Sequence, residues 1–232
     1  MKKALYDFIV RLGMKVLGKI FPDIHMSTPL KPSDRFLEYP FVFGRLAPKS
    51  ARVLDIGSSG SFFPLIAASL GHDVTGCDIR SYEILNHLSF NNFKFIQRDI
   101  VKDPLEENSF DVVTCISTIE HVGLGGRHGA DVSDDGDIIM AKQILRVLKP
   151  GGKALITIPY GISEVVAPHH RIYDQNRIKM LESGFEVAEE EFYLMNNYGD
   201  WAKCSAQEGE KIRGGVNKYG LALLHLTKGK SA

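Results

Sequence analysis

The sequence is poor in cysteine, with three in 232 residues, at positions 77, 115 and 204. They lie far apart, and no two of them form a Cys-x-x-Cys pair. This excludes a disulfide framework and a thiolate zinc site, and it is typical of a protein kept in a reducing compartment. We therefore expect a cytoplasmic protein.

The chain also lacks a net charge, because 28 lysines and arginines balance 28 acidic residues. No stripe of basic residues with interleaved aromatics occurs in the core, so we expect no nucleic-acid partner. No apolar run reaches the roughly 18 residues of a membrane span. The apolar residues at the N-terminus are interrupted by Asp7, Arg11 and Lys15, which does not fit a signal peptide.

Residues 2–21 have the spacing of an amphipathic helix, with one narrow polar stripe and apolar residues over the rest. The stripe consists of Lys3, Asp7, Arg11, Lys15 and Lys19. Two interpretations stay open: the helix packs on the rest of the chain or caps its substrate cleft, or it lies on an anionic membrane surface, at the inner face. Prolines then predict an extended connector, which separates residues 1–32 from a single domain at 33–232.

One stretch, residues 52–71, predicts a strand, a tight turn and a helix. A buried strand runs to Ile56, and the helix has Ser61 as its cap and Gly71 as its end. Free N–H groups and the helix dipole then lie above the carboxyl edge of the strand, where open α/β sheets bind polar ligands. Asp55 would repel a pyrophosphate there, but it would accept hydrogen bonds from an ammonium group. This favours a cofactor that carries an amino acid over a dinucleotide.

The alternation of strands and helices continues along the chain. Further strands are predicted at residues 73–78, 93–99, 110–116 and 153–158, with helices that begin at Asp137 and Asp174. Two final strands, at about 186–194 and 219–227, have no strong helix between them, which allows an antiparallel hairpin at one sheet edge. The pattern predicts the α/β class, with one doubly wound, mostly parallel sheet of seven strands.

Several short motifs follow one another in a fixed order. They are Val-Leu-Asp55-Ile-Gly57, the acids Asp78 and Asp99 at the ends of the next two strands, Asp111-Val-Val, and Leu-Lys-Pro-Gly-Gly152. Together they resemble the motif series of the class I S-adenosylmethionine-dependent methyltransferases, over about residues 45–230. The resemblance implies a Rossmann-like methyltransferase fold and S-adenosyl-L-methionine as cofactor. Ser59 and Ser61 depart from the family, which usually has glycines there.

The resemblance also implies which residues bind the cofactor: Asp55, Gly57, Ser59, Gly60, Asp78, Ile79, Asp99, Ile100 and Ser117. Asp55 and the turn would face the methionine part, with Ser117 beside it. Asp78 would bind the two ribose hydroxyls, and Asp99 the adenine amino group. Carboxylates suit these places because hydrogen bonds to a charged acceptor are strong.

Four residues are candidates for the chemistry of transfer: His121, Glu120, His128 and His170. A histidine suits the deprotonation of a hydroxyl near neutral pH. His121 follows the fourth strand, where the family presents residues to its substrate, and Glu120 would orient it or help to hold a cation. His128 lies in a glycine-rich loop, and His170 in the turn His169-His-Arg-Ile-Tyr173. A structural role is the alternative: Glu120 and His121 would open a helix, and His170 and Tyr173 would brace one.

The acceptor is less defined than the cofactor. No Asn-Pro-Pro-Tyr sequence follows the fourth strand, so a small-molecule or glycan acceptor, possibly lipid-linked, is favoured over a nucleobase. Similarity to bacterial methyltransferases of surface-polysaccharide pathways favours a sugar hydroxyl. We expect no metal site, because Glu120, His121, His128 and His169 lack the spacing of a known one. The alternatives are a module that binds the cofactor without turnover and an NAD(P)-dependent oxidoreductase, which the absence of Gly-x-Gly-x-x-Gly disfavours.

Overall fold

The structure, a computed structural model, describes residues 33–46, 50–81, 91–125, 131–195, 200–215 and 219–230, with single positions 5, 8, 9, 12, 13, 16 and 19. It divides into two units, residues 1–32 and 33–232. In the first unit all seven described positions are helical. Its large apolar side chains are exposed: Leu5, Phe8, Ile9, Leu12 and Val16. No helix among the described residues has the length and apolar character needed to cross a bilayer.

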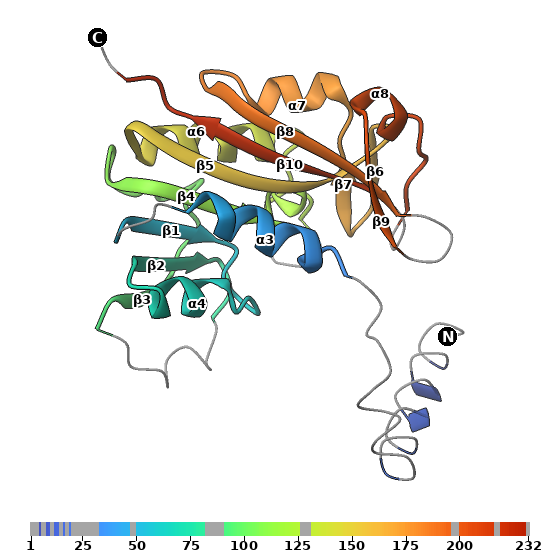
Figure 1. Ribbon diagram of the computed structural model, residues 1–232, viewed down its shortest axis with the longest axis horizontal. Coiled ribbons are helices and arrows are strands. Elements are labelled where there is room, and N and C mark those ends of the chain that lie inside the picture. Colours follow the sequence, from blue (N-terminus) through green and yellow to red (C-terminus); the bar gives the residue numbers. More distant parts are fainter. Residues whose placement is uncertain are drawn as a thin grey trace. The chain divides into compact units, whose positions relative to one another are not determined.

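The second unit is built on one sheet of eight strands, in the order β3-β2-β1-β4-β5-β10-β8-β9 (Figure 1). The strands are β1 (Arg52–Ile56), β2 (Asp73–Asp78), β3 (Phe93–Gln97), β4 (Phe110–Ile116), β5 (Leu148–Tyr160), β8 (Glu186–Met195), β9 (Trp201–Cys204) and β10 (Gly220–Thr227). Strands β1 to β5 run parallel, whereas β8, β9 and β10 pair antiparallel. The predicted fold class is confirmed, with one strand more than expected.

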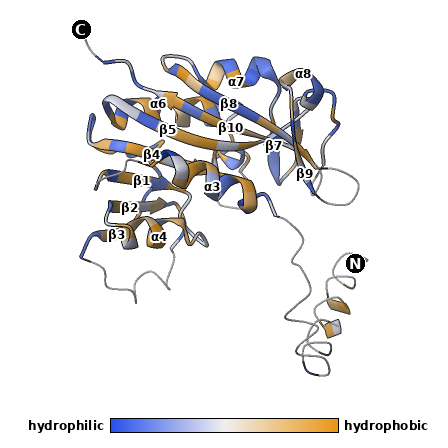
Figure 2. Cartoon of the chain, viewed as in Figure 1, coloured by the Kyte–Doolittle hydropathy of each residue, from blue (hydrophilic) through white to orange (hydrophobic). Residues whose placement is uncertain are grey.

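Helices cover both faces of this sheet. Helices α3 (Arg35–Arg45) and α4 (Phe63–Ser69) lie on one face, and α6 (Gly136–Val147) and α7 (Gln175–Leu181) lie on the other (Figure 1). A hydrophobic core lies on each face of the sheet, and successive strand residues point into opposite cores. Val53 and Leu155 pack with α3 and α4, whereas Leu54 and Ile156 pack with α6 and α7. Hydrophobic colouring is accordingly strong along β1, β10 and α4 (Figure 2).

The C-terminal third differs in detail from the sequence prediction. Strands β8 and β10 do pair antiparallel, but β10 lies between β5 and β8, and β9 forms the sheet edge. Strand β5 extends beyond the predicted 153–158: it begins at Leu148, which pairs with Phe110. A small hairpin of β6 (Glu164–Val166) and β7 (His170–Ile172), followed later by the short helix α8 (Ala206–Gly209), completes the described elements.

Candidate functional site

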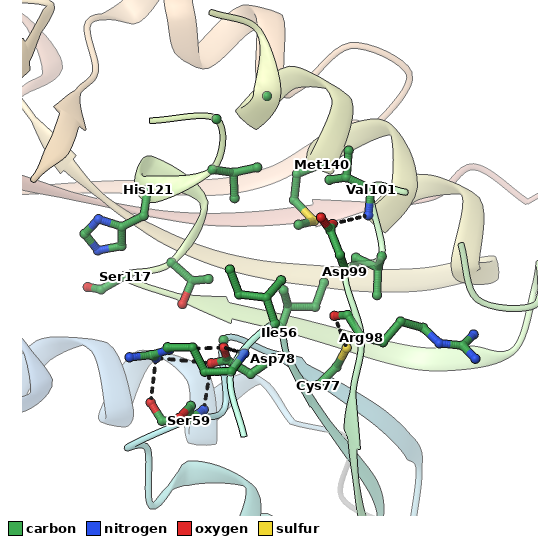
Figure 3. Close-up of a pocket in the computed structure, with 18 of the residues that line it drawn as sticks. Ile56, Ser59, Cys77, Asp78, Arg98, Asp99, Val101, Ser117, His121 and Met140 are labelled. Atoms are coloured by element: carbon green, nitrogen blue, oxygen red, sulfur yellow. Dashed lines mark hydrogen bonds and ion pairs between the residues drawn. The ribbon is translucent and has the colours of Figure 1, made fainter. Parts of the chain in front are cut away.

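A cavity of about 510 Å³ opens at the carboxyl ends of the parallel strands β1 to β4 (Figure 3). Helix α3 adds Arg35 to its wall, and α6 adds Ile139 and Met140. The predicted cofactor residues that line it are Gly57, Ser59, Gly60, Asp78, Ile79, Asp99, Ile100 and Ser117. Residues that end different strands therefore share one cavity, the position at which open α/β sheets bind ligands.

The turn after β1 passes very close to the exit of β4. Gly57 has φ +82°, and a Cβ atom there would lie 2.1 Å from Thr118 Oγ1. Gly60 has φ +85°, but a Cβ atom there would meet nothing within 4 Å. Only glycine fits at position 57, for both conformational and steric reasons. The turn thus places the backbone of Gly57, Ser59 and Gly60 along the cavity wall, where its polar groups can bind a polar ligand.

Asp55 lies behind this turn and not on the cavity wall. Its carboxylate is buried and accepts hydrogen bonds from Thr114 Oγ1 at 2.7 Å and Ser58 Oγ at 2.9 Å. Burial raises the pKa of Asp55 to about 7, against the opposing effect of these two hydroxyls. Asp55 therefore stabilises the turn through its hydrogen bond with Ser58. Its contact with an ammonium group of the cofactor stays a prediction.

Asp78 ends β2 and presents its carboxylate at the cavity (Figure 3). Its Oδ2 accepts the Ser59 N–H at 2.9 Å, and its Oδ1 accepts the Arg80 N–H at 2.9 Å. The Arg80 guanidinium bonds both oxygens, each at 3.2 Å. The sequence prediction missed Arg80, although its place two residues after a strand-end acid was a usable signal.

Asp99 follows β3, the neighbour of β2 in the sheet, and lines the same end of the cavity as Asp78. Its Oδ1 accepts the Val101 N–H at 3.1 Å, and Lys102 lies 3.9 Å from its Oδ2. Lys102 also forms a 2.7 Å ion pair with Asp131, which precedes α6. Apolar side chains of α6 and the buried Ile100 complete this end, so it combines apolar side chains with a carboxylate acceptor, as a purine needs.

A buried acid on α3, Glu38, organises the opposite end of the cavity. Its Oε1 accepts the hydroxyls of Ser117 at 2.5 Å and Thr157 at 2.6 Å, and its Oε2 pairs with Arg35. The Ser117 N–H donates to Thr157 Oγ1 at 3.0 Å, which helps to hold Ser117 at φ +44°. Burial raises the pKa of Glu38, and the charge of Arg35 opposes this. The sequence prediction missed Glu38; its signal was an acid three and four positions before the apolar Phe41 and Val42.

His121 lines this same end of the cavity, in a short helical turn, η1 (Ile119–His121). Its Nδ1 lies 2.5 Å from the carbonyl oxygen of His169, which only accepts hydrogen bonds. Nδ1 therefore carries the proton, and in the neutral ring the lone pair is on Nε2, 3.6 Å from Glu120 Oε1. Glu120 is buried, and its Oε2 has no hydrogen-bond partner among the described residues. Burial raises the pKa of Glu120 to about 8.

Of the other predicted catalytic residues, the structure describes His170. His170 is buried in β7, with its ring centroid 5.3 Å from that of Tyr219 and 6.5 Å from that of His121, and it does not line the cavity. His128 lies outside the described residues. Within the described part of the chain, no three His, Cys, Asp or Glu side chains are grouped to hold a metal ion.

Solved structures share this arrangement of sheet and helices. An S-adenosylmethionine-dependent methyltransferase from Methanosarcina mazei has a TM-score of 0.59 at 17% identity, covering 83% of this chain and 99% of that one. The N-methyltransferase NodS from Bradyrhizobium japonicum WM9, solved with S-adenosyl-L-homocysteine, has a TM-score of 0.56 at 15% identity, covering 85% and 88%. The fold is that of the class I S-adenosylmethionine-dependent methyltransferases.

Sequence comparison supports the same class. The chain is 33% identical over 141 residues to a ubiquinone biosynthesis O-methyltransferase from Xanthomonas axonopodis pv. citri (strain 306). The aligned part covers 58% of this chain and 51% of that protein. The chain thus spans about half the length of the curated relatives it matches. The predicted methyltransferase fold is confirmed, and these relatives support the predicted class of enzyme and its cofactor, S-adenosyl-L-methionine. The chain belongs to the family described as "Caenorhabditis protein of unknown function, DUF268", which matches residues 84–220.

Proposed function

We propose that this chain transfers a methyl group from S-adenosyl-L-methionine to a hydroxyl oxygen of a small-molecule, lipid or glycan acceptor. One observation carries the proposal. A single cavity has strand-end acids, Asp78 and Asp99, at one end and a histidine of fixed tautomer, His121, at the other. The first end fits a nucleoside, and the second fits an acceptor that must lose a proton.

The residues present fit the cofactor. Asp78 would hold the ribose hydroxyls and Asp99 the adenine amino group, while the Gly57 turn and Ser117 would line the methionine part. When bound, the cofactor supplies a methyl group on a sulfonium, which is already activated for displacement. The chain then has to align the acceptor and remove its proton.

His121 is the proposed base. Its Nδ1–H is held by the His169 carbonyl, which leaves Nε2 to take the proton of the acceptor hydroxyl. Glu120, which is buried and lies 3.6 Å from Nε2, stabilises the imidazolium that forms. The hydroxyl oxygen gains the methyl group as it loses the proton, so charge and atoms balance.

Two measurements test this function. Calorimetric titration should show binding of S-adenosylhomocysteine and none of NAD or NADP; NAD binding alone would favour an oxidoreductase. His121→Ala should lower methyl transfer from labelled cofactor to extracted cell-envelope and small-molecule fractions by about 10²- to 10⁴-fold. His121→Ala should leave the binding of S-adenosylhomocysteine unchanged. His225→Ala, on β10, is the control and should leave both this binding and methyl transfer unchanged. Binding without transfer in the wild type would favour an inactive, cofactor-binding module.

We also propose that the first unit contacts an anionic membrane surface, in line with a lipid-linked acceptor. The described apolar positions 5, 8, 9, 12 and 16 recur at helical spacing, which gives one continuous apolar face. Three lysines, one arginine and one aspartate form the polar stripe, which therefore carries a net positive charge. Leu12→Glu should reduce sedimentation with phosphatidylglycerol vesicles. Equal sedimentation would leave the helix with a packing or capping role.

A further inference from the structure

Hydrogen bonds from the chain itself fill the acceptor positions of the Asp78 carboxylate. Its side chain is 5% exposed and accepts four hydrogen bonds, two at each oxygen. Two come from backbone N–H groups, those of Ser59 and Arg80, which are fixed by the turn and by the end of β2. The other two come from the Arg80 guanidinium, through Nε and Nη2.

A carboxylate offers about four lone-pair positions, and all four are used here. The backbone donors cannot leave without unfolding the turn. The guanidinium can, because the Arg80 side chain is 44% exposed and its one further hydrogen bond within the described residues runs from Nη2 to the Ser59 carbonyl, at 3.1 Å. A ribose diol that binds Asp78 through both hydroxyls must therefore take the two positions that the guanidinium holds.

We propose that Arg80 is a further residue of the donor site, which aligns the Asp78 carboxylate in the empty cavity and competes with the ribose for it. The inference rests on the ribose role of Asp78 in the proposed function. Arg80 keeps the carboxylate oriented. When the cofactor binds, its two neutral ribose hydroxyls replace the Nε and Nη2 donors of the charged guanidinium at Asp78. Because salt screens an exposed guanidinium more than it weakens hydroxyl hydrogen bonds, affinity for the cofactor rises with ionic strength.

The test is titration calorimetry of the full chain with S-adenosylhomocysteine at 20 mM and 300 mM NaCl. Arg80→Met keeps the apolar stem and removes the donors. We expect about two- to fivefold tighter binding at low salt, the size of a partly exposed ion pair, and loss of the rise in affinity with salt. Arg52→Met is the matched control: Arg52 is 47% exposed and lies 3.8 Å from Asp73 at the other end of the sheet, so wild-type affinity and salt response should remain.

A second readout follows Arg80 directly. The Nε–H signal of Arg80, assigned by its loss in the Met variant, should be protected from exchange in the free protein and lose this protection when S-adenosylhomocysteine binds. Unchanged or weaker binding by Arg80→Met, or protection that persists in the complex, overturns the inference. Failure of both wild type and variant to bind S-adenosylhomocysteine refutes the donor site itself, and with it the proposed function.

Discussion

The two ends of the cavity are built in different ways. The nucleoside end, at the exits of β1, β2 and β3, uses the Gly57 turn after β1 and the acids Asp78 and Asp99, each next to its strand in sequence. The acceptor end joins α3, the exit of β4, and β5: Glu38 meets Ser117 and Thr157, which lie 79 and 119 residues away. The first end depends on local sequence, and the second on long-range packing around buried acids.

This difference has an energetic side. Asp78 and Asp99 keep their carboxylates at the cavity surface, where ligands or cations reach them. Glu38 and Glu120 lie below the surface, with raised pKa values caused by burial. Acids of the first kind serve binding, whereas acids of the second kind fix neighbouring groups at a cost in stability that hydrogen bonds must offset.

Gly57→Ala should have the largest effect, because it combines a disfavoured φ with a Cβ atom 2.1 Å from Thr118 Oγ1. We expect the free energy of unfolding to fall by about 4 kcal/mol or more, with loss of cofactor binding. Gly60→Ala in the same turn meets no atom within 4 Å and should cost only about 1 kcal/mol. Equal losses in denaturant unfolding would show that steric contact with the β4 exit does not set the turn.

Glu38→Ala should be the most damaging change at the acceptor end. It leaves the hydroxyls of Ser117 and Thr157 without their acceptor, and we expect a loss of about 2–3 kcal/mol in unfolding free energy. Glu189→Ala, which breaks the half-exposed ion pair with Arg45, should cost less than about 1 kcal/mol. Similar costs for both variants would remove the distinction between a buried and a surface acid.

Asp78→Ala tests the nucleoside end through binding rather than stability. Loss of a charged acceptor for two hydroxyls should weaken S-adenosylhomocysteine binding by about 2 kcal/mol, roughly 30-fold, in calorimetry. Asp73→Ala, at the exposed start of the same strand, is the control and should bind as the wild type does. Wild-type affinity in Asp78→Ala would remove the ribose assignment.

The pH dependence of stability should report the buried acids. Burial raises the pKa of Asp55 from 3.8 to about 7 and that of Glu120 from 4.5 to about 8. The folded protein therefore holds protons that the unfolded chain has released, and the free energy of unfolding falls as pH rises through this window. Asp55→Asn and Glu120→Gln should each flatten the fall between pH 5 and 8, by on the order of 1–2 kcal/mol.

Denaturant unfolding across this pH range measures the effect. Asp111→Asn is the control, because hydrogen bonding and the charge of Lys149 lower the pKa of Asp111 against its partial burial. Its contribution is already complete above pH 5, so the slope should match that of the wild type. A wild-type slope in both Asp55→Asn and Glu120→Gln would contradict the buried-acid account.

Asp131→Asn should have the smallest effect. The Lys102–Asp131 ion pair, with 2.7 Å between Nζ and Oδ2, is exposed and lies at the nucleoside end of the cavity. Such pairs contribute little in water, so S-adenosylhomocysteine binding should change less than twofold, and less still at high salt. A larger change would mean that this pair helps to close the nucleoside end, which would make the two ends more alike.

Much of the nucleoside end was predictable from sequence. The acids Asp78 and Asp99 and the Gly57 turn stand beside their strands, so a correct strand assignment also brings them together. Asp55 shows the limit of this reasoning: its place at a strand end was predicted, but its side chain turns to Thr114 and Ser58. The direction of a side chain at a strand end depends on the neighbouring strand.

The acceptor end was predictable only in part. His121 was identified from its place after the fourth strand, but its fixed tautomer depends on the His169 carbonyl, 48 residues away. Glu38 and Arg35 were missed because the spacing of polar and apolar residues along α3 does not reveal that a charged side chain is buried there. The eighth strand, β9, was missed because four residues with mixed polarity give no clear period.

The sequence alone predicted the fold class and seven strands of the sheet, because these depend on local periodicity, and its resemblance to a methyltransferase family implied the cofactor. Only the tertiary structure decided which acids face the cavity and which brace it, that Arg80 occupies the proposed ribose carboxylate, and that α3 reaches the β4 exit. Those features depend on contacts between distant segments, which form only when the sheet and its helices pack together.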